Sequence, residues 1–215
     1  MRTIAYVAIL AVFLSGTGTA LAQTSVTVDP GKINAGFMNV FDLGGGYVFG
    51  QTWGFADLTA VYSGGELTLG AAPIDDPDPF WYVGGGAPGA QGNKIMEAAG
   101  YAQEDGTLSG MTVEFTGFVL ANTLTGPHTV VAFIRDFAPD FSSFNEEAIP
   151  LGAPGGFSVS LATINDPTRH VQYGFLMVGP NAWPTDVADF GTMVIGPDLA
   201  VPTEPTSMSR VKAQY

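Results

Sequence analysis

The feature that most limits how this chain can fold is an alternation of apolar and polar residues with a period of two. It runs through Phe157 to Ala162 (FSVSLA) and recurs in Met111 to Leu120 (MTVEFTGFVL), where Val113 and Phe115 share one side. Side chains of a β-strand point alternately to opposite faces, so these segments predict strands with one face buried.

Four more segments fit strands. Thr129 to Asp136 (TVVAFIRD) is almost continuously apolar, as expected of a strand buried on both faces. Phe55 to Leu69 predicts two strands joined at the turn Ser63-Gly64-Gly65, whose glycines can take positive φ. Val171 to Val178 and Phe190 to Ile195 complete the set.

Turn residues separate these segments: 29 glycines and 15 prolines recur along 215 residues and argue against long helices. Lys94 to Ala102 alone has a helical composition, but Gly100 interrupts it, so a strand is predicted there as well. Closely spaced strands without helical patterns between them predict an all-β fold, namely an antiparallel two-sheet β-sandwich of the jelly-roll type.

The first 22 residues have the features of a secretory signal peptide. Arg2 precedes an apolar run from Ile4 to Leu14, too short to span a bilayer, and an A-x-A exit ends at Ala22. A retained N-terminal anchor is the less favoured alternative. The predicted organisation is a signal peptide at 1–22, one β-sandwich domain at 23–200 and a flexible tail at 201–215. We expect a secreted or cell-surface protein, periplasmic or extracellular, without membrane insertion after cleavage.

The chain is strongly acidic, and cleavage would change its formal charge from −13 to −14 because only Arg2 is lost. Such a surface repels phosphates and anionic lipids, so nucleic acid is not expected as a partner. Much of this acidity has an ordinary explanation in the solubility of an exported protein.

The chain contains no cysteine. A disulfide framework, thiol catalysis and thiolate metal sites are therefore excluded. Stability must come from a hydrophobic core, which a chain of this length can build.

No catalytic constellation is evident. His128 and His170 lie in turn-to-strand contexts, and there is no G-x-S-x-G elbow or H-E-x-x-H spacing. A triad can be scattered along a chain, so its absence is not established by sequence. The adjacent glutamates Glu146 and Glu147 fit a solvated loop better than an acid/base pair. We expect a protein that is not an enzyme.

Calcium is a possible structural ion. Asp75, Asp76 and Asp78 fall within four residues, among prolines that stiffen their loop. Hard cations favour such oxygen ligands, although the spacing is not that of an EF-hand. Asp-Pro pairs also mark ordinary turns, and this alternative stays open.

Aromatic residues in loops are candidates for stacking on sugar rings. Trp81 and Tyr82 follow the acidic loop and would alternate across a strand, so one of them at most should face solvent. Trp183 lies in a second turn-rich loop, whereas Trp53 borders an apolar strand and fits the core. For each single tryptophan, burial remains the more common outcome.

A second group of candidate ligand-binding residues follows a predicted strand. Arg135 could form an ion pair with Asp136 or Asp140 that holds the loop, or could present its guanidinium to ligand hydroxyls. His170 and Gln172, on another predicted strand, would be its companions on the same surface.

Six short motifs carry a resemblance that extends over nearly the whole mature chain. They are Met38–Asp42 (MNVFD), Trp53–Leu58 (WGFADL), Asp78–Trp81 (DPFW), Gly92–Lys94 (GNK), Ala132–Phe137 (AFIRDF) and Val171–Phe175 (VQYGF). With these motifs the chain resembles exported, non-catalytic β-sandwich modules of environmental bacteria. The resemblance implies a carbohydrate-binding-like jelly roll and supplies no ligand residues.

These observations favour a secreted, carbohydrate-binding-like β-sandwich, non-catalytic, whose partner is a polysaccharide or cell-surface glycan. The alternative is a structural cell-surface or extracellular-matrix protein that self-associates through exposed sandwich edges. A hydrolase with scattered carboxylates is the least favoured interpretation.

Overall fold

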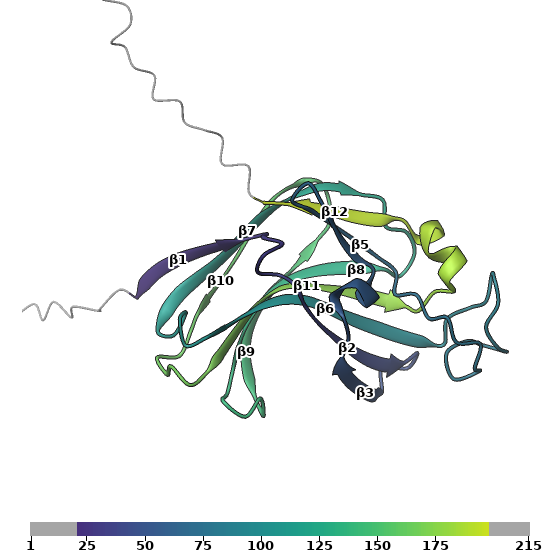
Figure 1. The fold of residues 1–215 in the computed structure, drawn as a ribbon, viewed down its shortest axis with the longest axis horizontal. Coiled ribbons are helices and arrows are strands. Elements are labelled where there is room, and N and C mark those ends of the chain that lie inside the picture. Colours follow the sequence, from purple (N-terminus) through teal and green to yellow (C-terminus); the bar gives the residue numbers. More distant parts are fainter. Residues whose placement is uncertain (1–20, 198–215) are drawn as a thin grey trace, which may run out of the picture.

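The computed structural model describes residues 21–197, which form two sheets packed face to face (Figure 1). Sheet A contains β1 (Ala22–Thr27), β4 (Ala60–Ser63), β5 (Glu66–Gly70), β7 (Met111–Asn122), β10 (Gly155–Ala162) and β12 (Thr192–Gly196). Sheet B contains β2 (Ala35–Asp42), β3 (Tyr47–Thr52), β6 (Lys94–Asp105), β8 (Thr129–Phe137), β9 (Phe144–Leu151) and β11 (His170–Pro180). Two short 3-10 helices, η1 (Phe55–Leu58) and η2 (Pro184–Phe190), lie in connections.

The strand order is that of a jelly roll. Sheet B runs β3-β2-β6-β11-β8-β9, and in sheet A the order β4-β5-β12-β7 continues to β10 on the far side of β7. From β5 to β12 the chain crosses between the sheets at every step except β8 to β9, which builds two interlocked Greek keys. The predicted two-sheet antiparallel sandwich is confirmed; the one parallel pair among the described strands is β1 with β7.

The predicted strands are found with modest shifts of their ends. Lys94–Ala102 lies in β6, as predicted, and the turn at Gly64 and Gly65 joins β4 to β5 with φ of 60° and 90°. Both values are positive, as a tight turn between twisted strands requires. The prediction of a strand from Phe55 is wrong for Phe55–Leu58, because this segment forms the 3-10 helix η1.

Asn145 to Glu147 is a second correction. The acidic residues there predicted a solvated loop, yet they lie in β9, which pairs with β8 along its whole length. Their side chains are exposed because β9 is an edge strand, whose burial begins only at Ile149 and Leu151 near its other end.

An aromatic cluster joins the two sheets. Phe115 of β7 lies with its ring centroid 5.4 Å from that of Tyr173 and 5.3 Å from that of Phe175, both on β11. Phe157 of β10 packs against Phe115 at 5.5 Å. Phe115 and Phe175 are almost fully buried, and for Phe115 this is what the alternation in its strand predicted.

Residues 1–20 and 198–215 lie outside the described part, so the predicted signal peptide, apart from its last two residues, and the predicted tail at 201–215 are not tested. Ala22 begins β1 and faces Met111 of β7, so cleavage after Ala22 would remove only the first residue of this strand. Among residues 21–197, no helix has the length and apolar character needed to cross a membrane.

One buried ion pair ties the β10–β11 connection to sheet B. Asp136 of β8 points away from the outer face, with only 1% of its side chain exposed, and accepts from Arg169 Nε at 2.8 Å. Its second carboxylate oxygen accepts the backbone N–H of Ile164 at 2.8 Å, and its carbonyl accepts from Arg169 Nη2 at 2.7 Å. The sequence suggested Asp136 as a partner of Arg135; that is wrong, because neighbouring residues of a strand face opposite ways.

We expect Asp136→Ala to lower the free energy of unfolding by about 3–5 kcal/mol, because it removes the charge that pairs with Arg169 and leaves the Arg169 Nε–H and the Ile164 N–H without their acceptors. Denaturant unfolding followed by tryptophan fluorescence measures this. Lys32→Ala, which breaks the exposed Lys32–Glu104 pair, is the control and should have a much smaller effect. Equal losses in the two variants would contradict the structural role of Asp136.

Candidate binding groove on the outer face of sheet B

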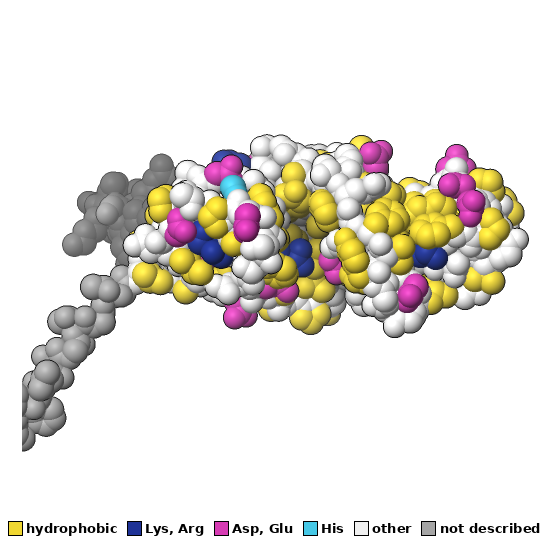
Figure 2. Space-filling model, turned by 90° about the horizontal axis from the view of Figure 1, so that it is seen from below, with side chains coloured by type: hydrophobic (Ala, Val, Ile, Leu, Met, Phe, Trp, Pro, Cys, Tyr) yellow, Lys and Arg dark blue, Asp and Glu magenta, His cyan; other side chains and the backbone are white. Residues whose placement is uncertain are grey.

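The outer face of sheet B carries a groove of about 670 Å³. It lies between the edge strands β3 and β9, and Figure 2 shows hydrophobic side chains and a basic side chain in a hollow on that side of the molecule. Twelve residues line it: Phe37, Asn39, Thr52, Glu97, Ala99, Tyr101, Gln103, Arg135, Phe137, Phe141, Phe144 and Gln172. A groove of this volume is of the size that ligand sites use.

Strand alternation explains why these side chains share a face. On β6, Met96 and Ala98 are buried between the sheets, while Glu97, Ala99 and Tyr101 point outward into the groove. The same alternation on neighbouring strands brings the other outward residues into register. The site is therefore a product of sheet pairing and draws on six strands and one loop.

The floor of the groove is apolar and buried. Ala99, Phe133 and Leu176 lie on this outer face yet are 4%, 0% and 6% exposed, because larger side chains cover them. Gly174 sits in register between Tyr101 and Phe133. A Cβ at Gly174 would come within 2.1 Å of the Gly100 carbonyl oxygen, so the close backbone approach there requires glycine.

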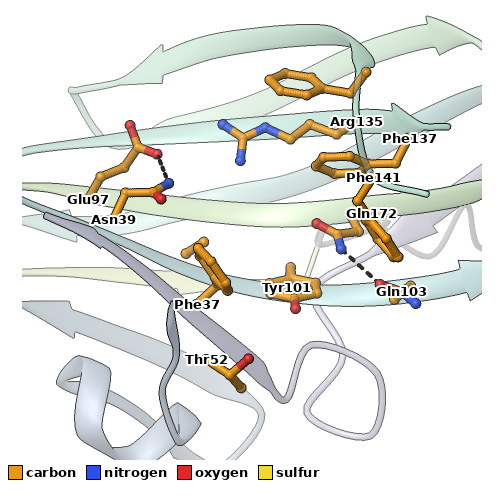
Figure 3. Close-up of a pocket in the computed structure, with 12 residues that line it drawn as sticks. Phe37, Asn39, Thr52, Glu97, Tyr101, Gln103, Arg135, Phe137, Phe141 and Gln172 are labelled. Carbon is orange, nitrogen blue, oxygen red and sulfur yellow. Dashed lines mark hydrogen bonds between the residues drawn. The ribbon is translucent and has the colours of Figure 1, made fainter. Parts of the chain in front are cut away.

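Arg135 lies over this floor. Its guanidinium carbon is 4.6 Å from the centre of the Phe133 ring and 5.1 Å from that of Phe144, and its Nε donates to Glu146 of β9. Among residues 21–197, its two terminal nitrogens make no hydrogen bond. Figure 3 shows the side chain extended along the groove, so those nitrogens are available as donors to a ligand.

A chain of amides orients the polar side of the groove. Gln172 Nε2 donates to Gln103 Oε1 at 2.8 Å, and Gln103 Nε2 donates to Asp105 Oδ1 at 3.0 Å (Figure 3 shows the first bond). An ionised carboxylate only accepts, so Asp105 sets the orientation of both amides. Gln172 Oε1 is left as an acceptor opposite Arg135, its register partner on β8.

The other end of the groove has a second polar pair. Asn39 Nδ2 donates to Glu97 Oε1 at 3.0 Å, which leaves the second oxygen of Glu97 and the amide oxygen of Asn39 as acceptors. Tyr101 and Phe37 lie between the two polar ends (Figure 3). Burial raises the pKa of Tyr101, so its hydroxyl stays protonated at neutral pH.

An aromatic wall closes one end. The ring centroid of Phe137 is 4.9 Å from that of Phe144 and 5.5 Å from that of Phe141. Phe141 belongs to the loop between β8 and β9 and stacks on His170 at 4.4 Å with the rings nearly parallel. The hydrogen bond that the His170 ring donates to Asp105 raises the pKa of His170.

The structure brings together some of the residues that the sequence singled out. Arg135 and Gln172 line the groove. His170 lies two residues before Gln172 on β11, and its ring stacks on that of Phe141. Asp140 does not join them or Arg135: its Oδ1 accepts from the backbone N–H and hydroxyl of Ser142 and holds its own loop.

The aromatic residues near the acidic loop lie elsewhere. The prediction that Tyr82 could stack on a sugar is wrong, because its side chain is 0% exposed. Its hydroxyl lies 2.5 Å from the Ile74 carbonyl oxygen and 2.8 Å from the Ala182 carbonyl oxygen. Trp183 is half-buried, with its ring 5.5 Å from that of Tyr82. Trp81 is half-buried between Phe80 and Phe49, with centroid distances of 4.8 and 6.2 Å.

Segment 74–93 is therefore first a structured connection between β5 and β6. Asn93 and Asn181 lock it: the Asn93 N–H and Asn181 Nδ2 both donate to the Trp81 carbonyl oxygen, at 2.8 and 3.0 Å. The Lys94 Nζ atom lies 4.3 Å from the centre of the Phe80 ring, on its face. Trp53, expected in the core, is half-buried and packs against it.

The acidic residues of this segment are occupied with turn hydrogen bonds. Asp76 Oδ1 accepts the N–H of Asp78 at 3.0 Å, and Asp78 Oδ1 accepts that of Phe80 at 2.7 Å. In the described part of the chain, no three Asp, Glu, His or Cys side chains are grouped as metal ligands. Calcium binding by Asp75, Asp76 and Asp78 stays a prediction from sequence.

Sequence reasoning missed most of the groove. Phe37, Asn39, Glu97, Tyr101 and Gln103 were not proposed as ligand contacts. Alternation on β6 was a usable signal, because it separates Glu97, Tyr101 and Gln103 from the buried residues. Alternation within β6 does not predict which strands lie beside it in the sheet.

Comparison with known proteins adds little. No protein-family model matches the chain, and no curated protein matches it. A solved structure concerned with the promiscuous specificity of carbohydrate-binding modules from the β-sandwich superfamily is similar over 77% of this chain and 73% of its own, at 16% identity and a TM-score of 0.22. That likeness is too slight to bear on function, and the fold assignment rests on the strand order itself.

If calcium binds at Asp75, Asp76 and Asp78, we expect it to raise the melting temperature and a chelator to reverse this rise. Scanning calorimetry with calcium and with EDTA measures this. The rise should disappear in Asp76→Asn and persist in Asp166→Asn, at another surface turn; a melting temperature that is the same with calcium and with EDTA would contradict the prediction.

Proposed function

We propose that this chain is an exported, non-catalytic, carbohydrate-binding β-sandwich protein whose ligand, a polysaccharide or cell-surface glycan, lies in the groove of sheet B. The observation that carries the proposal is the composition of the groove. Planar rings of Phe37 and Tyr101 lie between two sets of fixed polar groups, those of Arg135 with Gln172 and those of Asn39 with Glu97.

This arrangement suits a sugar chain because each pyranose has apolar faces and a rim of hydroxyls. A hydroxyl both donates and accepts, and the groove offers donors on Arg135 and acceptors on Gln172 and Glu97. The polar groups are held in place by neighbours before a ligand arrives, which reduces the ordering cost of binding.

A binding role is favoured over a catalytic one by the state of the carboxylates at the groove. Glu97 accepts from Asn39, and Glu146 accepts from Arg135. Glycoside hydrolysis needs one carboxyl group free to give a proton and a second one across the scissile bond. Turnover of a polysaccharide that Glu97→Gln abolishes would overturn the non-catalytic assignment.

We expect Tyr101→Ala to weaken glycan binding about threefold to tenfold, since one aromatic contact is worth about 0.5–1.5 kcal/mol. Binding of the wild type to a polysaccharide panel by affinity electrophoresis and calorimetry identifies the ligand first. Phe118→Ala is the control, because Phe118 is half-buried on β7 and its side chain points away from Val119, which faces the core. Equal affinities of all three proteins would place the ligand elsewhere.

A second candidate function, self-association through a sheet edge, is favoured by β3. Among the strands of residues 21–197, β3 pairs with β2 alone; it contains no charged residue or proline, and Tyr47 and Val48 are 64% and 40% exposed. At the opposite side, β9 and β10 lie beside each other, and β9 carries Glu146, Glu147 and Pro150, residues that discourage edge pairing.

If β3 pairs between copies, analytical ultracentrifugation should show a concentration-dependent dimer that Gln51→Lys abolishes, because a lysine on an edge disfavours pairing. Glu147→Lys, on the protected edge, is the control and should leave the dimer intact. A monomer at all concentrations would remove this second candidate.

A further inference from the structure

We propose that His170 is a positioning residue whose doubly protonated ring holds the aromatic end wall of the groove, so that the wall is ordered at acidic pH and loosens as His170 loses a proton. The effect on ligand affinity rests on the proposed function. The effect on the wall does not, because it follows from contacts within the chain.

The imidazole lies between two hydrogen-bond acceptors. Nδ1 is 2.7 Å from Asp105 Oδ1 on β6, and Nε2 is 3.3 Å from the carbonyl oxygen of Pro139 in the β8–β9 loop. Neither acceptor carries a proton to give while Asp105 is ionised. A neutral imidazole has one N–H and can satisfy one of them, whereas the imidazolium donates to both. The geometry therefore matches the charged ring.

The contact with Pro139 holds the loop that carries Phe141. Ala138 N–H donates to the Ser143 carbonyl and Phe141 N–H donates to the Ala138 carbonyl, both at 2.9 Å, which closes a tight turn. Phe141 has φ of +58°, in the left-handed region that non-glycine residues rarely occupy. Such a conformation persists only where surrounding contacts enforce it.

His170 supplies one of those contacts. Its ring is stacked on Phe141, with the ring planes 3° apart and the centroids 4.4 Å apart. Phe141 is 48% exposed and lines the groove, so little else covers it. Loss of the second imidazole proton removes the bond to Pro139 at the base of the loop and the charge that faces Asp105.

The same carboxylate also reaches the polar side of the groove. Asp105 accepts from Gln103, which in turn accepts from Gln172. When His170 is charged, Asp105 is neutralised locally and kept in place, so the two amides and the Phe141 wall are held by one ion pair. His170 thus acts on the groove through neighbours and does not line it.

Other charged groups near His170 have partners of their own. Asp140, in the same loop as Pro139, accepts from Ser142. Arg169, which precedes His170, is turned toward Asp136 on the other face of the sheet. Glu104, next to Asp105, pairs with Lys32. Asp105 is therefore the charged group that faces the ring directly, and its hydrogen bond raises the pKa of His170.

The direction of the pH dependence follows. A pKa raised in the folded state means that folding favours the charged ring. Its stabilising contribution is fully present below about pH 6.5, the value of an unperturbed histidine, and is lost as pH rises through the folded-state pKa.

Amide hydrogen exchange of the full chain between pH 5 and 9, corrected for intrinsic rates, tests the wall without any ligand. Protection of the Ala138 and Phe141 amides, whose N–H groups close the turn, should fall as pH passes the His170 midpoint, which is read from imidazole NMR signals. The Gly64–Gly65 hairpin turn, which has no histidine, is the internal reference. In the His170→Gln variant, the protection of these loop amides should be low at every pH.

Two results would overturn the proposal: loop protection that follows the reference turn at every pH, or an unchanged pH profile in His170→Gln. If His170→Gln does not fold, Asp105→Asn serves instead, and its His170 midpoint should move to lower pH. An unmoved midpoint would also count against the proposal.

The affinity arm is separate. For a glycan that the groove binds, the dissociation constant should rise about twofold to tenfold from pH 6 to 9, the effect of one lost hydrogen bond, and should stay constant in His170→Gln. An affinity that does not change with pH in the wild type would contradict the coupling to the groove. If no glycan binds at any pH, the proposed function fails, and the exchange experiment still decides the role of His170.

Discussion

Contact between Phe115 of sheet A and the Tyr173 and Phe175 rings of sheet B is the interaction on which the remaining structure depends. These rings come from β7 and β11, each of which has paired strands on both sides. Without cysteine, no disulfide joins the two layers, so burial of apolar surface between them must provide their cohesion. Once the inner faces are committed to that core, every second residue of each strand points outward.

The groove is a consequence of that commitment. Outward residues of β2, β6, β8 and β11 stand in register, and their size decides where the face is hollow. Gly174 leaves the middle open because the backbone of β6 approaches it too closely for a side chain. Arg135 then covers the Phe133 ring, and Phe37, Tyr101, Val131 and Val178 pack against the cluster of Ala99, Phe133 and Leu176. A sheet face that has a buried apolar floor and fixed polar ends differs from an ordinary solvated face, and this difference motivates a binding role.

Residues that are far apart in sequence meet on this face, and the sequence-based predictions succeeded and failed accordingly. Alternation correctly placed Val113 and Phe115 inward. The apolar run of β8 is buried on its inner face and at Phe133, but Arg135 and Phe137 on its outer face line the groove, so the expected burial on both faces holds only in part. Arg135 and Gln172 were chosen for their strand contexts and do lie in the groove. Tyr82 was chosen because it follows a loop, and it lies in the core, where its hydroxyl reaches two backbone carbonyls. Burial of a loop residue depends on what packs over it, which local pattern does not contain.

By itself, the sequence determined the strand class of the fold and the sidedness of individual strands, because both follow from the period-two geometry of an extended backbone. It also determined that no disulfide supports the fold. Only the tertiary structure decided which strands are neighbours, and hence that Glu146 is the partner of Arg135 and that His170 lies between Asp105 and Pro139. Such partners lie 11 to 65 residues apart in the chain. Their meeting depends on sheet order and register, which arise from the packing of the whole sandwich and not from any local segment.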